Sequence, residues 1–148
     1  MGATGTGKSA LALELAERVP AVIINADAMQ MVRELRIITA RPSDADMRCA
    51  EHALYGVLPA AEPTSVARWL ELVTPVITRA WAEEKLPLLV GGTGMYIKAL
   101  IEGLAKVPTI PPLVRDTVRA MDHSTRLAAL SVCDPAMAAR KRMGPDYD

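Results

Sequence analysis

Residues 2–9 of the chain read GATGTGKS and match the phosphate-loop pattern G-x-x-x-x-G-K-[ST]. Glycines in such a loop let successive backbone N–H groups turn toward one anion, and the helix that follows adds the positive end of its dipole. Lys8 would then neutralise the outer phosphates, and the Ser9 hydroxyl would bind Mg²⁺. A glycine-rich tail that matches by chance is the alternative, but a helical pattern that begins at Ser9 favours the phosphate loop.

Helices and short apolar strands alternate along the chain. Apolar residues recur at helical spacing over 9–19 and 65–81, and 95–104 resumes the same pattern. AVIIN (21–25) and LPLLV (86–90) are typical of strands buried on both faces of a parallel sheet. The sequence therefore predicts an α/β fold of the P-loop NTPase-like class, with a parallel sheet flanked by helices.

Two features depart from the ordinary form of such a fold. Pro75 lies inside the 65–81 helix, and because proline removes a backbone donor we expect the helix to break near residues 73–74. Met1 alone precedes Gly2, so we expect the first strand, which normally leads into the phosphate loop, to be missing. A sheet without that strand would expose apolar edges.

Composition narrows the classes of protein. The 148-residue chain has 17 Lys and Arg and 17 Asp and Glu residues, so a nucleic-acid partner would need a local basic patch. Cys49 and Cys133 belong to no Cys or His cluster, which argues against a zinc site or a disulfide framework. The apolar runs are far shorter than the roughly 20 residues of a membrane span, and no leader opens the chain. We expect a cytoplasmic protein that does not enter a membrane.

Asp27 directly follows the 21–25 strand, and the carboxyl ends of parallel strands line the ligand crevice in open α/β sheets. Its carboxylate is a candidate general base or Mg²⁺ ligand, whereas the alternative is a helix N-cap, a position that Asp also favours. The residues alone leave these interpretations even. Gln30, nearby, has an amide able to pair with an adenine edge, although a solvated surface position is more common.

GGTG at 91–94 follows the second strand and opens a helix, which repeats the arrangement of the phosphate loop. It is a candidate second anion or substrate cradle, with the Thr93 hydroxyl as a donor. A tight strand-to-helix turn is the simpler interpretation of the same residues. Neither His52 nor His123 has a partner at ligand spacing, and we expect both on the surface.

Longer stretches of the chain resemble one known family. They are GATGTGKSALALELAERVPAVIINADAMQ from residue 2, TARP at 39–42, LPLLVGGTGMYIKALIEGL from residue 86, PPLVR from residue 111 and DPAMAAR at 134–140. They resemble the tRNA dimethylallyltransferases, also called tRNA isopentenyltransferases, with few gaps from Gly2 to about Arg115. LVGGTGMYIKAL is far more specific to this family than a phosphate loop alone.

The resemblance implies transfer of a dimethylallyl group from dimethylallyl diphosphate to N6 of an adenosine beside the tRNA anticodon, with Mg²⁺ as cofactor. It implies that Asp27 is the general base, with Lys8 and Thr93 as further catalytic residues. We also expect the chain to be a monomer. The diphosphate would be bound by Gly2, Ala3, Thr4, Gly5, Thr6, Gly7, Lys8 and Ser9, with Ser9 on Mg²⁺. The anticodon stem-loop of the tRNA would be contacted by Asp27, Ala28, Met29, Gln30, Thr93 and Arg115.

The chain also departs from the family pattern. The family usually has Ser where Ala28 stands and Tyr where Val32 stands, so two hydroxyls are lost. The helical insertion after Arg115 is shortened, and the family's C-terminal third has no counterpart after Arg140. We expect a phosphate-loop α/β core over 1–112 and a remnant of the helical tRNA-binding region over 113–148, truncated at both ends.

Three other interpretations fit parts of the sequence, two of them enzymes and one an inactive fragment. Phosphate loops often bind ATP, and Asp27 after the 21–25 strand would suit a substrate hydroxyl, so a small-molecule kinase is one alternative. An adenylate isopentenyltransferase, which would use free AMP instead of tRNA as the acceptor, is a closer one. The last alternative is a fragment of a longer gene product that has no activity by itself.

Overall fold

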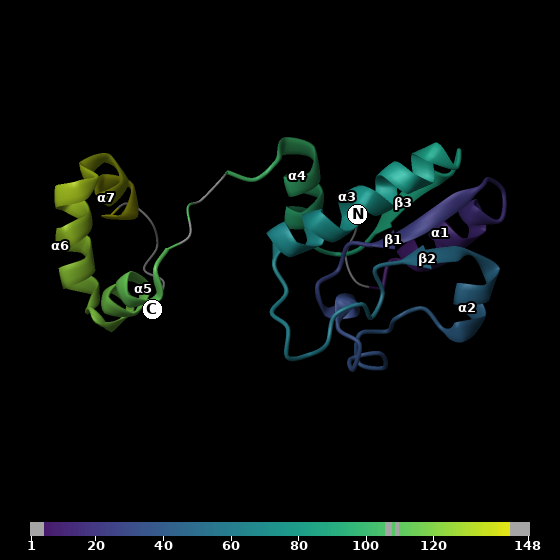
Figure 1. The fold of residues 1–148 in the computed structure, drawn as a ribbon, viewed down its shortest axis with the longest axis horizontal. Coiled ribbons are helices and arrows are strands. Elements are labelled where there is room, and N and C mark those ends of the chain that lie inside the picture. Colours follow the sequence, from purple (N-terminus) through teal and green to yellow (C-terminus); the bar gives the residue numbers. More distant parts are fainter. Residues whose placement is uncertain (1–4, 106–107, 109, 143–148) are drawn as a thin grey trace. The chain divides into compact units, whose positions relative to one another are not determined.

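The computed structural model describes residues 5–105, 108 and 110–142. The chain divides into two compact units, Met1–Ala105 and Lys106–Asp148, each of which is described by itself. The division falls a few residues before the boundary that we placed after residue 112. Figure 1 shows the first unit as a sheet flanked by helices and the second as a group of helices.

The sheet of the first unit is parallel throughout. β1 (Ala21–Asn25) lies in the centre, between β2 (Glu51–Ala53) and β3 (Leu86–Val90). All of β1 is buried, which explains its wholly apolar start. The strands predicted at 21–25 and 86–90 are confirmed, as is the parallel sheet. We did not predict β2, because Glu-His-Ala is short and mostly polar and becomes a strand through its pairing with β1.

Helices cover both faces of this sheet (Figure 1). Ile24 of β1 belongs to the buried cluster that contains Trp69. Ile23, the preceding residue, lines a small cavity with Leu13 instead. Because successive strand residues point to opposite faces, the helices that carry Trp69 and Leu13 lie on opposite faces of the sheet. The helices around the sheet are α1 (Lys8–Ala16), α3 (Val66–Ala82) and α4 (Gly94–Glu102).

α3 is one continuous helix through Pro75, so the break that we expected near residues 73–74 is wrong. Pro75 and Glu71 are both exposed, and water can therefore reach the Glu71 carbonyl that lacks its usual helical donor. On the opposite side the helix is held by its contact with the core. The buried residues of α3 are Trp69, Val73, Ile77 and Ala80. Tertiary packing thus overrides the local cost of the proline.

The segment between β1 and β2 contains two short helices, η1 (Met29–Met31) and α2 (Asp44–Cys49). α2 begins with a reciprocal capping box. The Ser43 hydroxyl accepts a hydrogen bond from the Asp46 backbone N–H at 3.2 Å, and the Asp46 carboxylate accepts one from the Ser43 backbone N–H at 2.8 Å. This box fixes the place of the Asp46 side chain beside the sheet.

The described part of the second unit is helical, with α5 (Pro112–Ala120), α6 (His123–Cys133) and α7 (Pro135–Arg142). Asp122 caps α6 by accepting a hydrogen bond from the Thr125 backbone N–H at 2.9 Å. α6 and α7 contact each other, whereas no residue of α5 or α6 is buried. Among the described residues of the whole chain, no helix has the length and apolar character that crossing a bilayer requires.

Candidate functional site

A cavity of about 270 Å³ opens where the carboxyl ends of β1 and β3 meet the start of α1. This is the place where ligands bind in open parallel α/β sheets. The phosphate loop contributes one wall, the residues after β1 and β3 contribute the others, and a loop near residue 40 completes it. Its lining consists of Gly5, Thr6, Gly7, Lys8, Ser9, Ala10, Asp27, Gln30, Thr39, Ala40, Val90, Gly91 and Gly92.

The described part of the phosphate loop needs glycine for its backbone conformation. Gly5 and Gly7 have φ angles of +80° and +76°, a region that other residues adopt only with strain. Among the described residues, nothing lies within 4 Å of the position that a Cβ would take at either glycine, so the requirement is conformational and not one of space. Gly7 is the N-cap of α1, so Lys8 and Ser9 lie in the first helical turn, where backbone N–H groups have no intrahelical acceptor. Gly2, Ala3 and Thr4 lie outside the described residues.

Asn25 holds the backbone of Asp27 at the end of β1. The Asn25 Nδ2 group donates to the Asp27 carbonyl at 2.9 Å and to the Leu54 carbonyl at 3.0 Å. Its Oδ1 accepts from the Asp27 backbone N–H at 2.9 Å. The Asn25 carbonyl in turn accepts a hydrogen bond from the indole N–H of Trp69 at 2.8 Å. Asn25 is fully buried, so this network ties Asp27 to β1, to the residue after β2 and to α3.

The two oxygens of the Asp27 carboxylate have different neighbours. Oδ1 accepts a hydrogen bond from the Met29 backbone N–H at 2.9 Å, which forms an Asx turn. The N-cap of η1 is Ala28, so the helix N-cap that the residues left open for Asp27 is wrong. Oδ2 lies on the side of Gly92, 4.0 Å from where a Cβ of that residue would stand. Because one oxygen is used by the Asx turn and the other remains on the cavity side, the turn leaves Oδ2 for a proton-accepting role.

Two tyrosines lie close enough to Asp27 to sense its charge. Burial raises the pKa of Tyr55 to about 12, and the negative charge of Asp27 adds to that effect. The pKa of Tyr96 is raised by the same two causes, with burial again the larger. The Tyr96 ring stacks on Trp69, with 4.7 Å between the ring centroids. Asp27 itself is half-buried in the wall of the cavity.

The GGTG segment shows why its first residue is glycine. A Cβ on Gly91 would stand 2.1 Å from the Ala26 carbonyl oxygen. The segments that follow β1 and β3 therefore lie too close together for any side chain at this position. The Ala26 backbone N–H donates to the Val90 carbonyl at 2.8 Å in the same place. Thr93 is the N-cap of α4 without a side-chain capping hydrogen bond. It is not among the residues that line the cavity.

The remaining predicted residues lie in several places. Gln30 lines the cavity, and its Nε2 group donates to the Thr39 carbonyl at 2.8 Å. Ala28 and Met29 do not line the cavity, and Met29 is 54% exposed. Arg115 belongs to α5 in the second unit, where its Nε lies 3.7 Å from Asp116 Oδ1.

Sequence reasoning missed Asn25, although AVIIN contains a signal. An amide side chain at the end of an otherwise apolar buried strand needs hydrogen-bond partners, and the next polar residue is Asp27. His52, expected on the surface, is half-buried, and its Nδ1 lies 2.9 Å from the Ala50 carbonyl oxygen. No pattern of spacing pointed to that position, because the neighbours of His52 come from other elements.

The Mg²⁺ site predicted at Ser9 stays a prediction. No group of three or more His, Cys, Asp or Glu side chains able to hold a metal ion occurs within the described ranges. Mg²⁺ commonly uses few protein ligands and completes its shell with waters and phosphate oxygens. A hydroxyl in the first turn after a phosphate loop, such as that of Ser9, fits this mode of binding.

Comparison with known proteins settles the family. The family model described as IPP transferase matches residues 30–145, and the model described as Isopentenyl transferase matches residues 1–55. The chain belongs to the IPP transferase family. The family resemblance seen in its sequence is thereby confirmed.

Curated members of the family match almost the whole chain. The tRNA dimethylallyltransferase of Rhodospirillum rubrum is 51% identical over 145 residues, which are 95% of this chain and 44% of that relative. The tRNA dimethylallyltransferase of Parvibaculum lavamentivorans is 47% identical over 95% of this chain and 46% of its own length. The chain therefore spans less than half the length of these relatives.

Solved structures of family members share the fold. The tRNA isopentenylpyrophosphate transferase of Bacillus halodurans is 32% identical, with a TM-score of 0.69 over 94% of this chain and 48% of that one. A eukaryotic dimethylallyltransferase acting on tRNA is 25% identical, with a TM-score of 0.82 over 94% of this chain and 36% of that one. The predicted phosphate-loop type of α/β fold is confirmed by these likenesses.

Proposed function

We propose that this chain carries the diphosphate-binding and proton-accepting part of a tRNA dimethylallyltransferase. The observation that carries the proposal is the cavity of about 270 Å³ that residues 5–9 share with Asp27. It combines groups suited to a diphosphate with a carboxylate suited to an N–H proton. The names of the curated relatives support the choice of this reaction among those open to a phosphate-loop protein.

In the proposed reaction the adenine N6 attacks the allylic carbon of dimethylallyl diphosphate. The C–N bond forms as the C–O bond breaks, and the diphosphate leaves with the electron pair of the broken bond. Asp27 Oδ2 accepts the proton that N6 loses, since Oδ1 is used by the turn. The backbone N–H groups of the first turn of α1, together with Lys8, stabilise the negative charge on the leaving oxygens. Mg²⁺, when bound at Ser9, would neutralise part of that charge.

The acceptor adenine has to leave the stack of the anticodon loop to reach Asp27, as bases do in other enzymes that modify them. Among the residues that line the cavity beside Asp27, Gln30 would bind the edge of the adenine. One amide hydrogen of Gln30 Nε2 holds the Thr39 carbonyl, so the second hydrogen and Oε1 remain for the base. Thr93, whose hydroxyl makes no capping bond, and Arg115 are further proposed tRNA contacts. We place the reaction in the cytoplasm.

Transfer of the dimethylallyl group to an anticodon stem-loop, in the presence of Mg²⁺, tests the proposal directly. Asp27→Asn is the matched control, because an amide oxygen still accepts from the Met29 N–H but takes up no proton. We expect product from the natural chain and a rate lower by about 10²- to 10⁴-fold in the variant. Equal product from both proteins, or none from either, would contradict the proposal.

Two further arms of the same assay identify the substrates. Free AMP in place of the stem-loop tests for an adenylate isopentenyltransferase, and we expect little or no product from it. ATP in place of dimethylallyl diphosphate tests for a kinase, and phosphoryl transfer to a small molecule would favour that alternative. Mass measurement of the acceptor separates these products, because each carries a different added group.

A further inference from the structure

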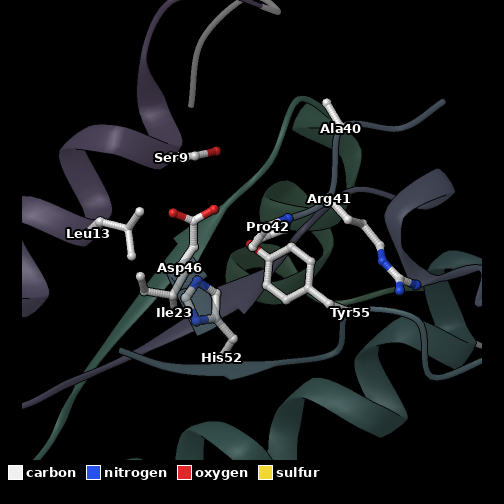
Figure 2. A pocket seen from close by; sticks show the side chains of 9 residues that line it. All are labelled: Ser9, Leu13, Ile23, Ala40, Arg41, Pro42, Asp46, His52 and Tyr55. Carbon is white, nitrogen blue, oxygen red and sulfur yellow. The ribbon is translucent and has the colours of Figure 1, made fainter. Parts of the chain in front are cut away.

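A second cavity of about 100 Å³ lies beside the first, and Ser9 lines both. α1, the loop before α2, α2 itself and β2 with the loop that follows it contribute its walls (Figure 2). Its polar side chains include Ser9, Asp46, His52 and Tyr55. At about 30 Å³ per molecule, a space of this size has room for about three waters next to the Ser9 hydroxyl.

Asp46 presents one unused oxygen to this space. The backbone N–H and the hydroxyl of Ser43 both donate to Asp46 Oδ2, at 2.8 and 2.7 Å. Oδ1 is therefore the oxygen left for a ligand. Figure 2 shows the Asp46 carboxylate pointing toward Ser9, with the His52 ring on its other side. The hydrogen bonds from Ser43 lower the pKa of Asp46, and His52 lowers it further, so the carboxylate is charged at neutral pH.

The other polar groups of this cavity are less suited to meet a cation at Ser9. His52 Nδ1 lies 2.9 Å from the Ala50 carbonyl oxygen, so this nitrogen donates its hydrogen there and only Nε2 remains. The guanidinium of Arg41 donates to the carbonyls of Val32 and Arg33 at 3.2 and 3.4 Å, and Figure 2 shows it turned away from Ser9. Asp46 is thus the carboxylate of this cavity that faces Ser9.

We propose that Asp46 is the outer carboxylate of the Mg²⁺ site, with Oδ1 accepting hydrogen bonds from waters of a cation bound at Ser9. This inference rests on the proposed function, which places Mg²⁺ and diphosphate in the adjoining cavity. Mg²⁺ dehydrates reluctantly and keeps several waters, so a carboxylate at one water's distance can hold it without direct contact. Substitution of a side chain in such an outer position typically lowers metal affinity by about 10- to 100-fold.

Calorimetric titration of inorganic diphosphate into the protein at a series of Mg²⁺ concentrations tests the inference without catalysis. Asp46→Asn keeps an oxygen that can accept from Ser43, and so keeps the cap of α2 while it removes the charge. We expect the Mg²⁺ concentration for half-maximal diphosphate affinity to rise about 10-fold or more in this variant. Asp44→Asn is the matched control, since Asp44 lies in the same helical turn but does not line the cavity.

Asp46→Glu guards against a folding artefact. Glu is favoured at this position of a capping box, so α2 stays capped and charged while the carboxylate moves by one methylene. We expect its Mg²⁺ requirement to lie between those of the natural protein and Asp46→Asn, with an unchanged melting temperature in all three. An unaltered Mg²⁺ requirement in Asp46→Asn, or an equal shift in Asp44→Asn, would overturn the inference and leave the proposed function standing. If the natural chain binds diphosphate equally well with and without Mg²⁺, or does not bind it at all, both the inference and the proposed function are overturned.

Discussion

Asn25 shows how much of the candidate site depends on one buried amide. It uses its donor and acceptor groups on the backbone of Asp27 and on the Leu54 carbonyl. A carboxylate that accepts a proton during a reaction has to stand in one place relative to its substrate. Asn25 supplies that constraint from the strand end, where the backbone pairing of β1 stops.

We predict that Asn25→Ala weakens both the fold and the reaction. The variant leaves the Leu54 carbonyl and both backbone groups of Asp27 without the partners that they have now. Fully buried groups left in this way cost about 1–3 kcal/mol each, but Asp27 is only half-buried, so water can replace part of its two bonds. We therefore expect the free energy of unfolding, measured in urea, to fall by about 2–4 kcal/mol. We also expect kcat to fall while KM changes little, because the diphosphate side of the cavity is untouched.

Val73→Ala is the control for loss of stability alone. Val73 is fully buried in α3 and makes no hydrogen bond with its side chain, so its truncation costs stability through lost packing. At matched stability, kcat should remain near the natural value in Val73→Ala and fall in Asn25→Ala. Equal losses of activity in the two variants would show that Asn25 acts through stability and not through the position of Asp27.

The phenol of Tyr55 reports the charge of Asp27. We predict that Tyr55 titrates near pH 12, and that Asp27→Asn lowers its pKa only part of the way to the ordinary 10.0, because burial is the larger cause. Tyrosinate absorbance of each protein, minus that of its Tyr55→Phe counterpart, isolates this group. The stability that the neutral phenol contributes is complete below pH 10 and is lost as the pH rises toward 12. An identical Tyr55 pKa in both proteins would contradict the closeness of the two side chains.

At this scale the sequence could predict Asp27 but not what positions it. The place of Asp27 follows from a general rule on parallel strands, which needs only the end of an apolar run. Asn25 bonds locally to Asp27, but its bonds with Leu54 and Trp69 join it to other elements, so no local spacing indicates those two. The Leu54 carbonyl is 29 residues away from Asn25.

The close approach of the chain after β1 and after β3 explains the first glycine of GGTG. The Ala26 carbonyl fills the space in which a Gly91 Cβ would stand, and the clash is with backbone atoms that cannot turn away. Gly92 is different, since its nearest neighbour would be a side-chain oxygen at 4.0 Å. Of these two adjacent glycines, Gly91 is therefore required by close packing between the strand ends, whereas the space around Gly92 would admit a Cβ.

We predict that Gly91→Ala destabilises the first unit and that Gly92→Ala does not. The added Cβ at Gly91 forces the strand ends apart, at about 1–3 kcal/mol or more of the free energy of unfolding. Gly92→Ala should unfold within about 0.5 kcal/mol of the natural chain and instead weaken binding of a base or diphosphate near Asp27. Urea unfolding followed by circular dichroism measures the first effect. Tolerance of alanine at both positions would contradict the close approach of Ala26.

Pro75→Ala is predicted to stabilise α3. The alanine N–H restores the hydrogen bond to the Glu71 carbonyl that a proline cannot make, and alanine is the better helix former by about 3 kcal/mol. Because that carbonyl is exposed to water, we expect a smaller gain of about 1–2 kcal/mol in the free energy of unfolding. Thr78→Ala, on the exposed side of the same helix, should change stability much less. A loss of stability in Pro75→Ala would show that the proline is favoured by the fold.

The helices and strands that could be predicted from the sequence are those that a local pattern of apolar residues determines. The apolar runs of β1 and β3 and the helical spacing of α1, α3 and α4 are local patterns, and the structure confirms them. β2 is a strand because β1 offers it hydrogen bonds, and α3 passes through Pro75 because its other face is buried. Both outcomes depend on contacts between elements, which local patterns do not contain.

On the scale of the whole molecule, the order of strands places an apolar strand at an edge. β1 pairs on both sides, with β2 and β3, whereas β3 pairs on one side among the strands that the structure describes. Leu86, at the start of β3, is 46% exposed. The sequence led us to expect exposed apolar edges in this sheet, and an edge of five residues with no charged side chain is a template for pairing with another chain.

We predict that the edge of β3, which no described strand pairs, makes the chain associate with itself as its concentration rises, against the monomer that we expected from the sequence. Leu86→Lys places a charge on the edge and should lower the weight-average mass in sedimentation experiments, since a charged edge resists pairing. Leu11→Lys is the control, because Leu11 is an equally apolar residue of α1 and is 66% exposed. If association arises from the edge, Leu86→Lys suppresses it and Leu11→Lys does not. A natural chain that sediments as a monomer at every concentration would contradict the prediction, and equal suppression by both variants would assign association to general surface hydrophobicity.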